Sequence, residues 1–204
     1  MTLGELARMF NAERKIGATL TVVPMKGYSR EALFADTHLP WTPPSPNLRT
    51  PSAALLYPGV GLIELTNVSV GRGTERPFEQ VGAPWIDADR LLAALVAEKL
   101  PGVTIAKTTF TPKASTFTGE LCHGVTLTIT TPRDLEAVRL GLALAVALKK
   151  LHPAEWKPAN LDTLLGHERA FAAVVAGHPL DRVMATFAEE TATFAARRKP
   201  YLLY

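Results

Sequence analysis

Two neighbouring segments with a two-residue period constrain the fold of this chain more than any other feature. In residues 121–130 apolar side chains alternate with small polar ones, ending in the run Thr-Leu-Thr-Ile-Thr. Alternate side chains of a strand share a face, so this pattern predicts one covered face and one partly wet face. Residues 103–110 also have the character of a strand, and the two segments are expected to pair as an antiparallel hairpin.

Helical patterns lie on both sides of this hairpin. Asp87 is placed to cap one helix, and Thr131-Pro132 predicts the start of a central helix that ends near residue 151. Further helices are expected from residue 161 onward, the first of them over residues 161–175. Because strands do not alternate strictly with helices, we predict an α+β fold. The expected architecture is a single domain over residues 1–204, with a small mixed or antiparallel sheet, helices packed on it and a helical C-terminal third.

The first part of the chain carries shorter signals. Thr2 and Glu5 have the spacing of a capping box for a helix over residues 3–13, and Thr50-Pro51 marks the start of another helix. Residues 20–24 (LTVVP) and 62–65 (LIEL) are each predicted to form a short strand. The last six residues, KPYLLY, are too apolar for a free tail and are expected to dock on the protein.

The connection from Asn67 to Trp85 is the first candidate for a functional site. Its glycines and prolines hold a shape that an ordinary turn does not need, and its aromatic residues argue against disorder. The segment Gly-Arg-Gly-Thr within it is a weak match to a phosphate loop, since no Lys-Ser/Thr follows. The simpler interpretation is a loop that presents Arg72 and Thr74. A planar guanidinium makes paired hydrogen bonds and suits a carboxylate ligand.

One carboxylate in this connection is a candidate catalytic residue. The carboxylates near the expected cleft are Glu64, Glu75, Glu79 and Glu120. Glycoside hydrolysis commonly needs a pair of carboxyl groups, one acting as acid and one as nucleophile or base. Glu79 lies inside the loop and is the catalytic candidate. The alternative for Glu79 is a structural carboxylate that caps loop amides or pairs with Arg72 or Arg76.

Composition argues against several other functions. A net charge of +3 with no long basic run argues against nucleic acid as a partner. The only cysteine, Cys122, precludes an internal disulfide, and the five histidines lack metal-ligand spacing, so no metal and no cofactor is expected. Cys122 and His123 are neighbours on a strand and face opposite sides, so they are not a catalytic dyad. No apolar stretch approaches the ~20 residues that a bilayer span needs.

Two loop tryptophans, Trp41 and Trp85, each lie beside or near proline. They are interpreted either as anchors that fix the loops or as platforms on which a sugar ring stacks. Anchoring is the simpler interpretation for each alone, while their occurrence in the two longest loops favours the platforms.

Six segments, taken in order along the chain, carry a family resemblance. They are TLGELARMFN, LTVVPMKGY, LPWTPPSPNLRT, LYPGVGLIELTNVSVGRGTERPFEQVGAPW, FTPKASTFTGELCHGV and RKPYLLY. Together they resemble the NamZ (YbbC-like) exo-β-N-acetylmuramidases, and the resemblance implies release of terminal N-acetylmuramic acid from the non-reducing end of peptidoglycan fragments. Family members also have a Rossmann-like N-terminal domain with the proposed catalytic glutamate. This chain is therefore expected to represent the C-terminal half.

The resemblance also extends to residues of two loops that we interpret as substrate-binding. They are Ser45 and Asn47 of the proline-rich loop, with Pro46 between them, and Asn67, Ser69, Arg72, Thr74, Phe78 and Trp85 of the central loop. We expect Asn67, Ser69 and Thr74 to hydrogen-bond sugar hydroxyls or the acetamido group. Arg72 is expected to face the lactyl carboxylate of muramic acid.

Three functional hypotheses follow. The first is the C-terminal substrate-cleft domain of a peptidoglycan muramidase, catalytic only with a Rossmann-like N-terminal domain or a second copy as partner. The second is a stand-alone sugar-binding or partner-binding module without hydrolysis, and the third is a truncated product that folds but has no activity. No signal peptide is visible. The chain is expected to be cytoplasmic if complete, and in the cell envelope or secreted if it derives from a longer precursor.

Overall fold

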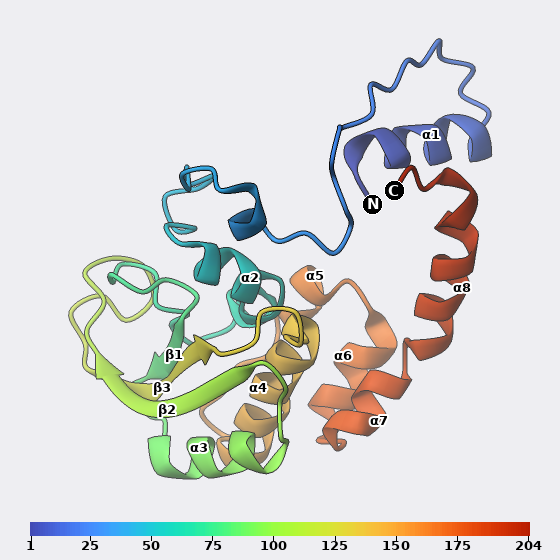
Figure 1. Cartoon of the computed structure of the whole chain (residues 1–204). Helices are drawn as coiled ribbons and strands as arrows, with labels where there is room; N and C mark the ends of the chain where they lie inside the picture. Colours follow the sequence, from blue (N-terminus) through green and yellow to red (C-terminus); the bar gives the residue numbers. More distant parts are fainter. The chain divides into compact units, whose positions relative to one another are not determined.

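The structure is a computed structural model that describes residues 1–204, and it divides into two compact units. The terminal unit combines Met1–His38 with Ala188–Tyr204, and the main unit comprises Leu39–Phe187. In Figure 1 the blue and red ends of the chain belong to the terminal unit. The α+β class, the small antiparallel sheet and the helical C-terminal third are confirmed.

Helices, short 3-10 turns and three strands follow one another along the chain. Their order is α1 (Leu3–Glu13), η1 (Phe34–Thr37), α2 (Pro51–Val60), η2 (Gly61–Ile63), β1 (Gln80–Ala83), α3 (Ala88–Ala97), β2 (Val103–Phe110), β3 (Cys122–Ile129), α4 (Ala137–Leu151), α5 (Leu161–Leu165), α6 (Glu168–Val175), α7 (Leu180–Ala185), α8 (Ala188–Arg198) and η3 (Lys199–Tyr201).

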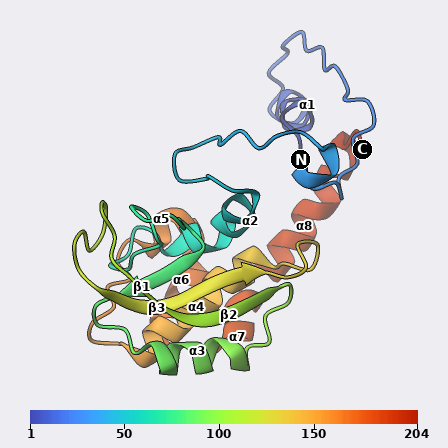
Figure 2. The same ribbon diagram turned by 60° about the vertical axis from the view of Figure 1, so that its left-hand side comes forward.

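The sheet of the main unit has the order β1-β3-β2, with both pairs antiparallel (Figure 2). The predicted hairpin is therefore confirmed as β2 and β3, with Ile105 opposite Leu127. Val125 and Leu127 are buried while Thr128 is exposed, as the two-residue period predicts. Strand β1 lies inside the connection that was predicted to be a loop. The sequence did not predict this strand, because four residues are too few to show a two-residue period.

One face of the sheet meets the helical layer. Helix α3 packs on β2 and β3, and α4 packs against α3, α2, α6 and α7. Leu142, Leu144 and Leu148 of α4 have no exposed surface, so this helix is the centre of the apolar core, as its sequence predicts. It begins at Ala137, however, and not directly after Thr131-Pro132.

Two predictions about local structure in the main unit are wrong. The segment LIEL forms no strand, because α2 continues into η2 and the amide of Thr66 bonds to the carbonyl of Ile63. These local hydrogen bonds satisfy the backbone without a strand partner. The helix expected over residues 161–175 is divided into α5 and α6, because Gly166 adopts a left-handed conformation and His167 caps the second helix.

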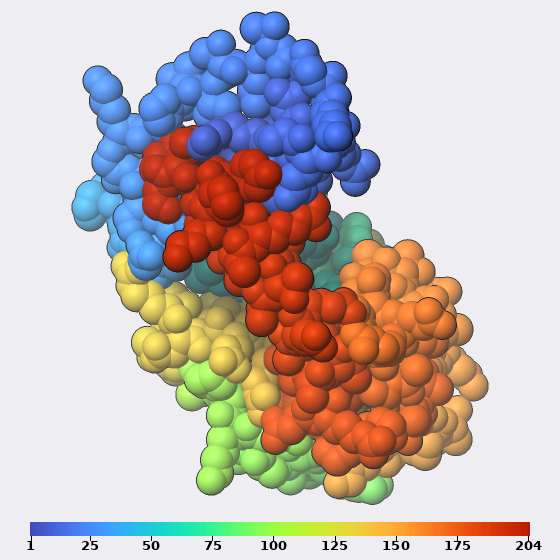
Figure 3. Space-filling view, turned by 90° about the vertical axis from the view of Figure 1, so that its right-hand side faces the viewer, coloured from blue at the N-terminus to red at the C-terminus, as the bar shows by residue number.

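The terminal unit is built around α1 and the end of the chain. The capping box of Thr2 and Glu5 is present, as predicted. The last residues dock on this unit: the amide of Leu203 donates to Glu5 (2.8 Å), and the amide of Met25 donates to the hydroxyl of Tyr204 (2.7 Å). Figure 3 shows the blue N-terminal atoms against the red C-terminal ones. Residues 20–24 form no strand here, and the prediction of one is wrong for this structure.

Candidate functional site: three loops of the main unit

Three loops of the main unit are joined by hydrogen bonds. They are the proline-rich loop (residues 39–50), the central loop (residues 64–79) and the hairpin loop between β2 and β3 (residues 111–121). Arg49 forms an ion pair with Glu75 at 3.3 Å, which joins the first loop to the second. The amide of Lys113 donates to the carbonyl of Gly73 at 2.9 Å, which joins the third. The central and hairpin loops lie beside each other in Figures 1 and 2.

Strained backbone gathers in these loops. Phe78, Ser115 and Phe117 have positive φ angles of 63°, 71° and 61°, a region that residues other than glycine rarely adopt. Gly73 has a φ of 79°, and a Cβ there would overlap the backbone of Ala114. Strain of this kind persists only where the surroundings fix it, and it is common at functional sites. The loops are therefore the best candidate for a binding surface in the main unit.

Arg72 is one of two partly exposed arginines of the central loop, the other being Arg76. The side chain of Arg72 is 44% exposed and its Nη1 donates to Glu64, which is largely buried. The other guanidinium nitrogens make no hydrogen bond within the protein. A guanidinium fork held at one nitrogen keeps donors for a second, incoming carboxylate.

Glu79 is held between two elements. Its side chain is only 12% exposed, accepts a hydrogen bond from the hydroxyl of Thr50 (2.7 Å) and pairs with Arg76 (3.2 Å). Thr50 also caps α2 by accepting from the amide of Ala53. Glu79 thus connects the central loop to the start of α2, which is the structural alternative that the sequence leaves open. Its catalytic role stays a prediction.

The polar groups of Asn67 and Ser69 bond within the protein. The Asn67 side chain donates to the carbonyl of Glu155 (2.9 Å) and accepts from the amide of Lys157 (2.6 Å). The Ser69 hydroxyl is buried and accepts from the amide of Gly71 (3.3 Å). In this structure both residues position the central loop, and their contact with a sugar stays a prediction.

Thr74 has a similar structural role and is partly exposed. Its hydroxyl donates to the carbonyl of Gly71 (2.6 Å) and accepts from the side-chain amide of Gln80 (2.8 Å). Because Thr74 and Arg72 flank Gly73, the two side chains belong to the part of the loop that touches the hairpin loop. A hydroxyl and a guanidinium are thus presented by one tight turn.

The aromatic residues of the site pack against their surroundings. Phe78 is buried and meets Tyr57 edge to face, with ring centroids 4.9 Å apart. Trp85 is half-buried, and the centroid of its ring lies 5.3 Å from that of His152. Burial lowers the pKa of His152, which accepts a hydrogen bond from the amide of Asp87. Phe78 and Trp85 are anchors in this structure.

The two predicted residues of the proline-rich loop interact with each other. The amide of Asn47 donates to the hydroxyl of Ser45 at 3.4 Å, and both side chains are half-buried. The indole of Trp41 donates to the carbonyl of Leu48 (3.1 Å), which fixes the fold of this loop. The sugar-binding roles of Ser45 and Asn47 stay predictions.

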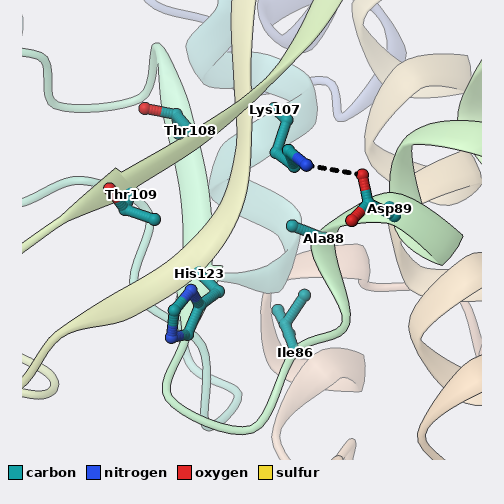
Figure 4. A pocket seen from close by; sticks show the side chains of 7 residues that line it. All are labelled: Ile86, Ala88, Asp89, Lys107, Thr108, Thr109 and His123. Atoms are coloured by element: carbon teal, nitrogen blue, oxygen red, sulfur yellow. Dashed lines mark hydrogen bonds and ion pairs between the residues drawn. The ribbon is translucent and has the colours of Figure 1, made fainter.

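A separate hollow lies between the start of α3 and the strands β2 and β3 (Figure 4). It encloses about 490 Å³, and His123 lines it beside an ion pair between Lys107 and Asp89 at 2.7 Å. Cys122 points to the opposite face, where burial raises the pKa of its thiol to about 11. The two neighbours are therefore not a dyad, and none of the predicted site residues lines this hollow.

No three His, Cys, Asp or Glu side chains are grouped so that they could hold a metal ion. No helix is long and apolar enough to cross a membrane.

Comparison with known families assigns the chain to one of them. Residues 55–204 match the family model described as exo-β-N-acetylmuramidase NamZ, C-terminal, and residues 1–52 match the corresponding N-terminal model. The matched family is one of peptidoglycan glycosidases. The chain belongs to the NamZ exo-β-N-acetylmuramidase family. The two matches meet near the start of α2, and the single domain expected over residues 1–204 stays a prediction.

Individual relatives agree with this assignment. The chain is 41% identical over 207 aligned residues to the peptidoglycan β-N-acetylmuramidase NamZ of Bacillus subtilis (strain 168), covering 100% of this chain and 50% of that protein. Crystal structures of two DUF1343 family proteins from Bacteroides fragilis NCTC 9343 have TM-scores of 0.76, at 27% and 31% identity. The chain covers 55% of each of them. It therefore spans about half the length of these relatives.

The hairpin loop was not among the predicted site residues. Ser115 and Phe117 carry two of the positive φ angles, and Lys113 bonds directly to Gly73. The signal was present, since Pro112, Gly119 and several small polar residues mark residues 111–121 as a shaped loop. Glu120 of this loop was expected near the cleft, but the direct hydrogen bond between Lys113 and Gly73 was not predicted.

Proposed function

We propose that the main unit supplies substrate-binding loops to a peptidoglycan glycosidase that releases terminal N-acetylmuramic acid from non-reducing ends. The catalytic domain would be the remainder of a NamZ N-terminal domain. The observation that carries the proposal is the partly paired Arg72 on a strained loop, in a chain 41% identical to a peptidoglycan β-N-acetylmuramidase. N-acetylmuramic acid carries a lactyl carboxylate, the group that a free guanidinium edge recognises.

Charge complementarity supports the assignment of Arg72. The chain has a net charge of +3, which mildly favours an anionic sugar. Arg49, Arg72 and Arg76 all lie in the joined loops, and each is paired with a glutamate. Of these glutamates, Glu64 and Glu79 are largely buried, so their charges fix the arginines and are not themselves presented to a ligand.

The test is the substitution Arg72→Ala, with Arg90→Ala on the exposed side of α3 as a control that removes the same charge. Affinity for N-acetylmuramic acid and for N-acetylglucosamine is measured by titration calorimetry. It is measured with this chain alone and with the chain mixed with the half of the Bacillus subtilis relative that it does not cover. We expect Arg72→Ala to weaken binding of the acidic sugar by roughly tenfold to a hundredfold, the effect of losing a charge-assisted hydrogen bond. Unchanged preference for the acidic sugar would remove the role of Arg72.

Glu79 is the carboxylate of this chain that we propose to test for catalysis. Glu79→Gln keeps a hydrogen-bond acceptor for Thr50 and removes the charge that pairs with Arg76. A catalytic carboxylate would cost several orders of magnitude in turnover, whereas a loop-positioning residue would cost much less. The rate of hydrolysis of a chromogenic muramic acid glycoside separates the two.

A stand-alone sugar-binding module is the second candidate. It is favoured by the main unit's own apolar core, which includes no residue of the terminal unit. This candidate predicts the same dependence on Arg72 with no hydrolysis in any mixture.

A further inference from the structure

The terminal unit has an apolar segment with no structural partner. Residues Thr19 to Pro24 belong to no helix or strand, and their backbone groups make no hydrogen bond. Their sequence, TLTVVP, is rich in the β-branched residues that favour strands. The sequence therefore specifies a strand that this structure leaves without a sheet.

The side chains of this segment already show a two-sided arrangement. Val22 is half-buried against Gly4 of α1, where any side chain on Gly4 would collide with it. Its neighbours Thr21 and Val23 are exposed, Val23 to 85%. One face of the segment thus packs on helix α1, and the other face is exposed to solvent. A strand of an α/β sheet would look like this if helices covered only one face of the sheet.

The same unit has further exposed apolar side chains. Leu3, Ile16, Leu20 and Met25 are all exposed, Leu3 to 86%. Met9 is the one hydrophobic residue of this unit that is buried. Large apolar surfaces that are exposed in one unit often mark a site of interaction with a partner.

The family matches indicate what covers this surface. Residues 1–52, which contain the whole segment, match the N-terminal family model, and this chain covers only half of the Bacillus subtilis relative. We propose that Thr19–Val23 pair as a β-strand with the sheet edge of the remainder of a NamZ N-terminal domain. Helix α1 then covers one face of that sheet. The proposal rests on the proposed function and adds to it the surface through which the catalytic part docks.

Strand addition explains each observation with one partner. A sheet edge offers a row of backbone donors and acceptors to Thr19–Val23, and its faces bury Val23 and the neighbouring apolar side chains. Pro24 follows directly and has no amide to donate, which suits the end of a strand.

The experiment mixes this chain with the half of the Bacillus subtilis relative that it does not cover, expressed separately. Association is measured by titration and light scattering, and backbone amide exchange is followed by mass spectrometry. We expect a one-to-one complex in which amide exchange in residues 19–23 is slowed by about tenfold or more relative to the free chain. Val23→Asp should weaken association by roughly tenfold or more.

The matched control is Val96→Asp, which places the same charge on an exposed valine of α3 in the main unit and should leave association within about twofold. Both valines are exposed, so neither substitution threatens the fold. The proposal is overturned if no complex forms, if residues 19–23 exchange at the free rate in the complex, or if Val23→Asp behaves like Val96→Asp. It is also overturned if this chain alone dimerises with protection of that segment, since the partner is then a second copy.

Hydrolysis by the same mixture separates this proposal from the proposed function. A complex that protects residues 19–23 but does not hydrolyse the glycoside supports docking and contradicts the enzymatic role. Hydrolysis without protection of the segment supports the enzymatic role and contradicts docking.

Discussion

The two units of this chain are stabilised in different ways. The main unit has a continuous apolar core, in which Leu127 of the sheet and Leu144 of α4 have no exposed surface. The terminal unit buries Met9 and the carboxylate Glu5, and its other contacts are mostly polar. A domain needs a core to offset the entropy of folding. The main unit meets this requirement, whereas Met9 is the one buried hydrophobic side chain of the terminal unit.

Ion pairs take the place of a core in the terminal unit. Glu5 pairs with Arg30 at 2.6 Å, and Glu13 pairs with Arg197, which joins α1 to α8. The pair of Glu13 with Arg197 is partly exposed, so it contributes little and is screened by salt, whereas the carboxylate of Glu5 is buried. The contrast teaches that secondary structure and charge pairing hold this unit's segments together, while its apolar residues remain available for another surface.

The largest expected effect comes from the core of the main unit. Leu144→Ala removes a fully buried side chain and should lower the free energy of unfolding by about 3 kcal/mol, because a cavity remains. The matched control is Leu3→Ala in the terminal unit, where an exposed side chain is lost and the change should stay within about 0.5 kcal/mol. Urea denaturation measures both. Equal losses would contradict the contrast between the units.

A smaller effect is expected at the junction of the central and hairpin loops. Gly73→Ala combines a positive φ with an overlap against Ala114, and should cost roughly 2–3 kcal/mol. Gly119→Ala is the control, since its φ is also positive but no atom lies near its Cβ position, and it should cost about 1 kcal/mol. Thermal unfolding compares them. A Gly73→Ala variant as stable as Gly119→Ala would show that the loops do not meet as described.

The smallest effect concerns acid and is confined to the terminal unit. Burial raises the pKa of Glu5, but hydrogen bonds from Arg30, Leu203 and Thr2 outweigh it and lower that pKa to about 2. A carboxyl group with a lowered folded-state pKa stabilises the fold above its unfolded value of 4.5, and this contribution is lost as pH falls from there toward 2.

The measurement is an NMR titration of backbone amides between pH 6 and pH 2. The amide of Leu203 should lose its native shift over this range before that of Leu127 in β3, and Glu5→Gln should remove the difference. Simultaneous loss at both amides would mean that the two units unfold together.

Much of the fold could be predicted from local sequence. The caps at Thr2 and Asp87 and the alternation in β3 depend on neighbours within a few residues. Three segments could not be predicted this way. Residues 62–65 are apolar enough for a strand or a helical turn, β1 is too short for a period, and residues 20–24 have strand character without a sheet.

The candidate site shows the same limit. The glycines on both sides of Arg72 predicted a loop that presents this side chain, and Arg72 is partly exposed. The sequence also offered Arg76 as a partner for Glu79, and the two form an ion pair. The bonds of Asn67 to Glu155 and Lys157 connect residues about 90 positions apart, and no local pattern announces them. A polar residue in a loop can therefore be predicted, while its partner within the fold cannot.

The most direct measurement is hydrolysis of a chromogenic N-acetylmuramic acid glycoside. It is made with this chain alone and with this chain mixed with the half of the Bacillus subtilis relative that it does not cover. We predict no turnover by the chain alone, and turnover by the mixture that is reduced by Arg72→Ala and unaffected by Arg90→Ala. Turnover by the chain alone would contradict the need for a catalytic partner and would make Glu79 the first residue to replace. No turnover in either sample, with the complex formed, would contradict the enzymatic role and leave a sugar-binding module.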